Sequence, residues 1–145
     1  MTRHLYLVTF LVALSVNFVW EMLQSPLFAP MGGWLAATAR CAAASVGDGV
    51  IVVTIAAVGG VLFRRWDWFA RPGVIGRLFM ATCGIAVAIV IERRALSSGR
   101  WMYADAMPLV PALNVGVVPV LQMVVVPPLA CGIAAWWLRA PPQHK

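Results

Sequence analysis

Three carboxyl groups stand inside apolar segments of this sequence, at Glu21, Asp48 and Glu92. An ionisable side chain within a membrane-crossing segment is costly, so it usually faces the interior of the helix bundle and marks a functional site. A carboxyl group in a half-apolar pocket can serve as a general acid while a second carboxylate serves as a base. We therefore take these three residues as candidate catalytic groups.

Polar and aromatic residues accompany the acids along the chain. Asn17, Glu21 and Gln24 are spaced by four and then three residues, which places them on one face of a helix. Others enter from the third connection and from the start of the fourth apolar segment. The candidate binding residues are Asn17, Gln24, Arg93, Arg100, Trp101, Tyr103, Asn114 and Gln122.

Simpler explanations of the acids stay open at this point. Glu21 and Glu92 are also explained as solvated helix ends at the membrane interface, where a charge costs little. Asp48 is also explained as a helix N-cap whose carboxylate accepts backbone N–H bonds. Arg93 and Arg94 are also explained as the groups that neutralise Glu92.

The other polar candidates have similar alternatives. Trp101 and Tyr103 are equally typical of the aromatic belt at a membrane interface. Asn114 and Gln122 follow prolines, so their side chains are also candidates for satisfying backbone groups that those prolines leave free.

The elements that must position these residues are membrane-spanning helices. Of the 145 residues, 62% are hydrophobic and 11% are charged, and the mean hydropathy is +0.87. Soluble domains carry about 25% charged residues, so this composition excludes an ordinary soluble protein. The length suits one integral membrane domain over residues 1–145 with about four passes of ~20 residues each.

The apolar runs predict an all-α fold with four transmembrane helices. The expected spans are 5–24, 46–63, 78–95 and 117–138. Residues 27–45 are expected to form a loop and a short interfacial helix, 64–77 a cytoplasmic loop, 109–116 an irregular entry, and 140–145 a disordered tail. Prolines predict a kink in the fourth span. Gly59 and Gly60, with Ala56, offer a small-residue face for close helix packing.

Helix geometry places the three acids at a similar depth. Glu21 lies 16 residues into the first span, or ~24 Å, and Glu92 lies 14 residues into the third, or ~21 Å. Asp48 lies 15 residues before the end of the second span, or ~22 Å from it. Because the second span runs in the opposite direction, all three carboxyl groups are expected near the same, outer interface.

The basic residues predict the orientation. Seven lie at the termini and between spans two and three, whereas four lie on the other side. The side with more Lys and Arg is normally cytoplasmic, so both termini are expected in the cytoplasm of a bacterial inner-membrane protein. The net charge of +6 is therefore assigned to cytoplasmic loops and anionic lipid rather than to nucleic acid. The tryptophans, Trp66 and Trp68 among them, are assigned to interface belts.

The sequence disfavours a metal site built on cysteine or histidine. The three cysteines, Cys41, Cys83 and Cys131, are odd in number and include no CxxC motif, which disfavours a disulfide framework or a zinc site. His4 and His144 lie at the termini, far from the acids. No cofactor is expected.

Four short segments together resemble a family of small bacterial four-span membrane proteins without an established function. They are NFVWEMLQSPLF (17–28), GDGVIVV (47–53), IERRALSSGRWMYADAMPLVP (91–111) and GVVPVLQ (116–122). The resemblance covers most of the chain and implies a four-helix fold with a shared polar layer. It implies no activity.

Three functions are compatible with these observations. The first is an enzyme that acts on a lipid or isoprenoid at the outer leaflet. In it Glu21 and Glu92 form the acid–base pair, Asp48 is a third charge that tunes them, and Trp101 and Tyr103 line the substrate. The second is a transporter or binding protein for a cation or proton. The third is an accessory subunit of a membrane complex or a homo-oligomer, which the small size and the small-residue helix face favour.

Overall fold

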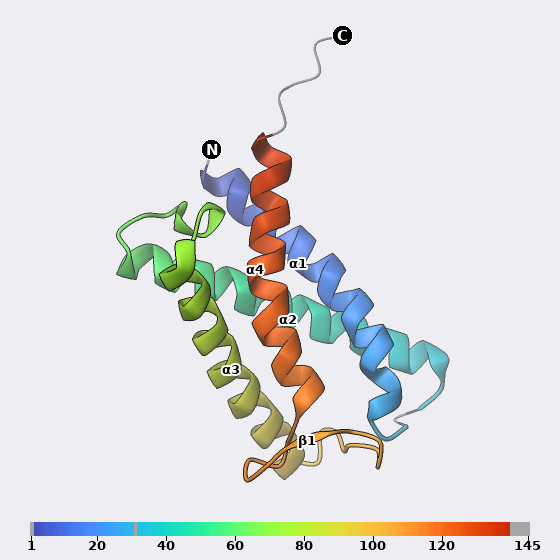
Figure 1. Cartoon of the computed structure of the whole chain (residues 1–145). Coiled ribbons are helices and arrows are strands. Elements are labelled where there is room, and N and C mark those ends of the chain that lie inside the picture. The colour runs from blue at the N-terminus through green and yellow to red at the C-terminus, as the bar shows by residue number, and fades with distance from the viewer. Residues whose placement is uncertain (1, 31, 140–145) are drawn as a thin grey trace.

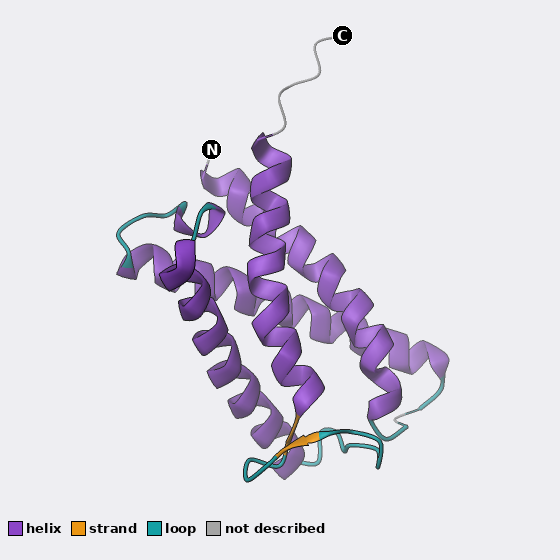
Figure 2. Cartoon of the chain, viewed as in Figure 1, coloured by secondary structure: helices purple, strands orange, loops and turns teal. Residues whose placement is uncertain are grey.

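The computed structural model describes residues 2–30 and 32–139. Its long helices are α1 (Thr2–Gln24), α2 (Trp34–Leu62), α3 (Gly73–Ser97) and α4 (Val117–Arg139), shown in Figure 1. The short elements are the 3₁₀ turns η1 (Ser25–Leu27) and η2 (Trp68–Ala70) and the strands β1 (Leu109–Val110) and β2 (Val115–Gly116), shown in Figure 2. Each long helix is long and apolar enough to cross a membrane. The predicted all-α fold with four such helices is confirmed.

The bundle has two distinct ends. The beginning of α1, the end of α4 and the α2–α3 connection lie at one end, which we call the terminal end (Figure 1). The ends of α1 and α3 and the β1–β2 hairpin lie near the other, which we call the pocket end. Helix α4 packs against both α1 and α3, whereas α2 packs mainly against α1.

Helix α2 begins earlier than the sequence predicts. It starts at Trp34, so the expected loop and interfacial helix at 34–45 are part of one helix of 29 residues. The Ala-rich stretch has high helix propensity, and the buried Gly49 lies against the Phe10 ring of α1. Asp48 therefore lies inside the helix, and the residue at the N-cap is Gly33. The interpretation of Asp48 as an N-cap is wrong.

The other boundaries differ less from the expected spans. Helix α3 begins at Gly73, five residues before the expected start, which shortens the α2–α3 loop. Helix α4 contains Pro127 and Pro128 within one continuous helix, and the predicted kink is not shown. Part of the expected irregular entry at 109–116 is an antiparallel hairpin that pairs Leu109 with Gly116. The tail at 140–145 lies outside the described residues.

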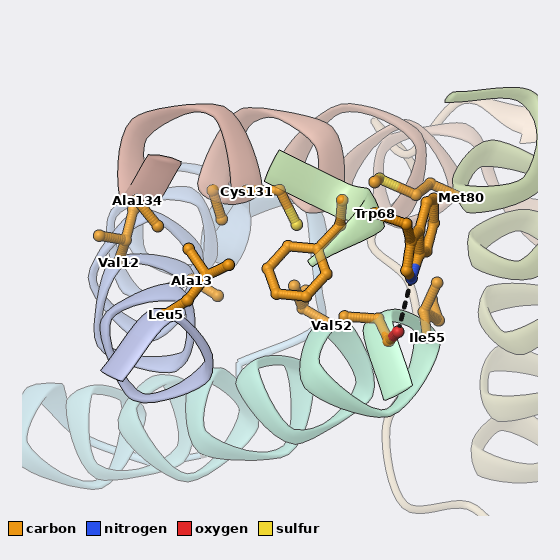
Figure 3. Packing of buried hydrophobic residues seen from close by; sticks show 12 residues of the cluster. Leu5, Val12, Ala13, Val52, Ile55, Trp68, Met80, Cys131 and Ala134 are labelled. Atoms are coloured by element: carbon orange, nitrogen blue, oxygen red, sulfur yellow. Dashed lines mark hydrogen bonds between the residues drawn. The ribbon is translucent and has the colours of Figure 1, made fainter. Parts of the chain in front are cut away.

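Trp68 is a core residue rather than an interface residue, as Figure 3 shows. Only 3% of it is exposed, and its indole N–H donates to the Ala56 carbonyl over 2.8 Å. The ring fills the space that a Cβ at Gly59 of α2 or at Gly76 of α3 would need. The small-residue face of α2 thus receives a tryptophan from the loop instead of another helix. Trp66, by contrast, is 54% exposed.

Helices α3 and α4 approach each other closely at one glycine. A Cβ at Gly84 would collide with the Met123 carbonyl of α4. This approach lies about two turns before Glu92 on α3 and one residue after Gln122 on α4. The glycine therefore sets the spacing of the two helices at the level where the polar residues begin.

Candidate pocket between the helices

The side chain of Gln122 joins three helices at the pocket end. Gln122 is 2% exposed, and its amide nitrogen lies 2.9 Å from Asn17 Oδ1, 3.1 Å from Glu21 Oε1 and 3.0 Å from Asp48 Oδ2. An amide has two N–H groups, so these three oxygens compete for two hydrogens. The oxygens of Glu21 and Asp48 share one nitrogen, so their separation cannot exceed the sum of the two bond lengths. Two carboxyl groups from α1 and α2 therefore meet at α4.

Gln24 extends this network along α1. Its amide nitrogen donates to Glu21 Oε1 over 2.8 Å and to Gln122 Oε1 over 3.0 Å. The indole N–H of Trp20 donates to Gln24 Oε1 over 3.2 Å. We call Asn17, Glu21, Gln24, Asp48 and Gln122 the amide–carboxyl cluster. The cluster orients Glu21 through two amides and Asp48 through one.

Glu92 is held by a separate set of partners. It is 5% exposed and accepts hydrogen bonds from the Tyr103 hydroxyl and, over 3.3 Å, from the Trp101 indole N–H. The backbone N–H of Gly116 donates to the Tyr103 oxygen over 2.8 Å. Burial, and next the hydrogen bond to Glu92, raise the pKa of Tyr103 above its usual range. Tyr103 is therefore a proton-bearing donor at physiological pH.

Glu92 and Glu21 differ in their exposure to solvent, which decides whether each can be a solvated helix end. The explanation of Glu92 as a solvated helix end is wrong, because its side chain is buried. Glu21 is partly exposed, and its Oε1 accepts hydrogen bonds from the side-chain amides of Gln24 and Gln122. Among residues 2–30 and 32–139, Arg65–Asp67 is the ion pair within 4.0 Å. Arg93 thus forms no such pair with Glu92, and no described arginine pairs with Glu21.

The cluster borders a pocket of about 880 Å³. All four helices and both loops at the pocket end contribute to its lining. The α2 side follows a helical repeat of three or four residues, with Ala37, Arg40, Cys41, Ala44, Gly47, Asp48 and Ile51. Small side chains at this face leave the volume open. Glu21, Glu92 and Arg100 also line the pocket.

Two loop segments pair at the same end of the bundle. The Ala29 N–H donates to the Met102 carbonyl over 2.9 Å, and the Ala104 N–H donates to the Leu27 carbonyl over 3.0 Å. Between them Phe28 packs on the aromatic residues of the second segment, with ring centroids 5.6 Å from Tyr103. The connection after α1 and the connection after α3 are therefore joined at the pocket.

The structure brings most of the predicted site residues together, but not all. The cluster contains five of them, and Glu92, Arg100 and Trp101 line the same pocket, with Tyr103 bonded to Glu92. Asn114 is exposed, has a φ of 52° and lies in the hairpin turn outside the pocket lining. Arg93 is also exposed and is not part of the lining.

Sequence reasoning missed the α2 face of the pocket. The sequence predicts a loop and a short helix here, whereas in the structure one helix carries Asp48 together with Ala37, Arg40, Cys41 and Ala44. Small residues occupy most positions from 37 to 48, so no helical periodicity distinguishes the pocket face, and the available signal is the high helix propensity of this Ala-rich stretch.

The described residues contain no group of three or more His, Cys, Asp or Glu side chains arranged to hold a metal ion. The sequence matches no protein-family model, and comparisons with curated proteins and with solved structures find no match.

Proposed function

We propose that this protein binds the polar group of a membrane lipid or isoprenoid in the pocket, next to Glu21 and Asp48. The observation that carries the proposal is a pocket of about 880 Å³ bordered by a partly buried amide–carboxyl cluster. Pockets of about 300–1,000 Å³ that combine apolar walls with a few polar groups are typical of small-ligand sites. The walls belong to apolar helices, so an amphipathic molecule of the bilayer is the matching ligand.

The chemistry available at this place is proton transfer. Glu21 and Asp48 approach one amide nitrogen from two helices, so one carboxyl group can donate a proton to a bound molecule while the other accepts one. Arg100 lines the same pocket and offers a positive charge to an anionic part of the ligand. We therefore propose acid–base action on the lipid as the activity of the pocket.

Filling the pocket tests binding. A Cβ at Gly47 would meet no atom within 4 Å, so Gly47→Phe adds a ring at the lining of the pocket with open space at its first atom. Gly132 of α4 also has open space around it and does not line the pocket, so Gly132→Phe is the matched control. Lipids that co-purify with each variant are measured by mass spectrometry. We expect Gly47→Phe to lose a lipid that wild type and Gly132→Phe retain; equal lipid content in all three contradicts the proposal.

The carboxyl groups are tested separately from binding. Glu21→Gln and Asp48→Asn keep the side-chain size, and Asp105→Asn changes an exposed carboxyl group that does not line the pocket. The lipid profile of producing cells is compared across the variants. We expect the first two, but not the third, to remove a lipid product. An unchanged profile in Glu21→Gln and Asp48→Asn refutes the acid–base activity and leaves binding to be judged by the pocket-filling variants.

The proposed location is a bacterial inner membrane with both termini in the cytoplasm. In support, the terminal end carries Arg3, Arg64, Arg65, Arg71 and Arg77 and a single acid, Asp67. The pocket end carries four arginines and four acids. A C-terminal fusion to a fluorescent protein that matures only in the cytoplasm tests this orientation. Bright cells are expected, and dark cells with an active periplasmic reporter in the same position would reverse it.

A further inference from the structure

The terminal end of the bundle holds a second, smaller cavity. Its volume is about 440 Å³, and it lies between the first turn of α1, the loop around η2 and the last turns of α4. Leu5 and Ala135 form apolar, buried parts of the lining. His4, Arg65, Asp67 and Arg71 also line it and are exposed, with two arginines against one acid. The cavity thus has a buried apolar wall and a basic opening.

The loop that supplies the arginines is firmly attached to the bundle. Trp68 and Phe69, which lie between Arg65 and Arg71, are 3% and 0% exposed. The ring of Phe69 packs edge-on against Tyr6 of α1 at 4.9 Å. Because the residues between the two arginines are buried, the backbone positions of both arginines are fixed before any ligand binds. Pre-organisation of this kind reduces the entropy that binding costs.

Backbone hydrogen bonds add to this attachment. The Arg65 N–H donates to the Gly60 carbonyl over 3.0 Å, and the Arg64 N–H donates to the Val61 carbonyl over 3.3 Å. With Arg64 at a φ of 55°, this is the Schellman ending of α2, in which glycine is the usual residue. The Arg71 N–H donates to the Trp68 carbonyl over 3.1 Å. The loop therefore has a defined shape at both arginines.

The charge of the two arginines is largely uncompensated. Asp67 lies 3.5 Å from Arg65 Nε, but both side chains are more than half exposed, and an exposed pair of this kind contributes little. Arg71 forms no ion pair within 4.0 Å among the described residues. A phosphate group accepts hydrogen bonds from a guanidinium in a bidentate geometry, which a single carboxylate contact at this distance does not match.

We propose that this cavity binds the phosphate of an anionic membrane phospholipid, which Arg65 and Arg71 contact while Leu5 and Ala135 face its glycerol and upper acyl region. Basic pockets between transmembrane helices are suited to anionic lipid headgroups. Trp136 and Trp137, which are 74% and 63% exposed beside Ala135, fit a position at the membrane interface. This site lies at the opposite end from the amide–carboxyl cluster and does not depend on the function proposed for that cluster.

The test measures binding of phosphatidylglycerol and of phosphatidylcholine to the purified full-length protein by native mass spectrometry. The variant Arg65→Gln/Arg71→Gln removes both proposed contacts. Arg93→Gln/Arg94→Gln removes two exposed charges from the pocket end and gives the same net charge. We expect the first pair to bind phosphatidylglycerol at least tenfold more weakly and the second pair to match wild type. Equal weakening in both pairs would show a general effect of net charge and overturn the site.

Two further measurements address the nature of the ligand. Asp67→Asn removes the competing carboxylate, so we expect tighter binding of phosphatidylglycerol and no change for phosphatidylcholine. Inorganic phosphate is added as a competitor, and we expect little displacement because it lacks the apolar part. Full displacement by millimolar phosphate, or equal binding of the two lipids by wild type, refutes an anionic-lipid site. Thermal unfolding of each variant shows whether it is folded.

Discussion

Replacement of Gln122 by leucine should destabilise the protein more than its single side chain suggests. Leucine has a similar volume but no polar atom. The change removes the two N–H groups shared by Asn17, Glu21 and Asp48, and it removes the oxygen that accepts from Gln24. Three hydrogen bonds are lost at one time, and the former partners remain in a buried or half-buried setting.

The size of the effect follows from these three bonds. Hydrogen bonds between membrane helices contribute about 0.6 kcal/mol on average, and those in soluble proteins about 1 kcal/mol. The change leaves Asn17 Oδ1 and the Asp48 carboxyl group without the donor they had, which adds to the cost, whereas Glu21 keeps the amide of Gln24. We expect the free energy of unfolding to fall by about 2–4 kcal/mol. The neighbouring variant Met123→Leu changes a buried apolar residue and should cost less than about 1.5 kcal/mol.

Unfolding is measured in mixed micelles by adding a denaturing detergent and following tryptophan fluorescence. The comparison needs wild type, Gln122→Leu, Met123→Leu and Gln24→Leu, which removes one side of the same network. We expect the order of stability to be wild type, Met123→Leu, Gln24→Leu and Gln122→Leu. If Gln122→Leu costs no more than Met123→Leu, the amide does not join the three helices, and the reasoning about the cluster is refuted.

Three other changes have defined outcomes. Tyr103→Phe removes the hydroxyl that donates to Glu92. The pKa of Tyr103 is raised in the folded protein, so its contribution to stability is present below about pH 10 and is lost as the pH rises further. The variant should therefore lose less stability than wild type between neutral and alkaline pH, and parallel pH profiles would contradict this. Arg64→Gly should raise the free energy of unfolding by up to about 1 kcal/mol, because glycine adopts the left-handed backbone of residue 64 without strain, whereas Arg77→Gly inside α3 should lower it by about 1 kcal/mol. Thermal unfolding compares the two variants, and a loss of stability in both would refute the strain argument. Gly84→Ala should destabilise by about 2 kcal/mol because its Cβ meets the α4 backbone, and an unchanged midpoint would show that the helices can separate freely.

Much of the fold could be predicted because the physics of membrane helices is local. An apolar run of about 20 residues must form a helix to satisfy its backbone in lipid, whatever its neighbours are. The span at 117–138 was therefore expected almost as α4 has it. The start of α2 was not, because the mixed stretch 27–45, with Arg40 in an Ala-rich piece, indicates a loop and a short interfacial helix, and the glycines at 47 and 49 have weak helix propensity. Contact with α1 outweighs the weak helix propensity of those glycines, and no local pattern reveals that contact.

The candidate site shows the same division. The depth of Glu21, Asp48 and Glu92 followed from the rise of a helix, and all three do line one pocket. Their partners did not follow from it, because side-chain pairing depends on which helix faces meet. Glu92 bonds to Trp101 and Tyr103 of the next loop, while Glu21 and Asp48 share Gln122.

By itself, then, the sequence determined the class of the protein, the existence of four helices and the level at which its acids lie, since each depends on composition and on spacing along one helix. Only the tertiary structure decided that Gln122 bridges two carboxyl groups, that Trp68 is buried in the core rather than at the membrane interface, and that small residues of α2 border a pocket. Those outcomes depend on the rotation and separation of packed helices. A close approach such as that of Gly84 to α4 sets them, and spacing along a single helix does not encode them.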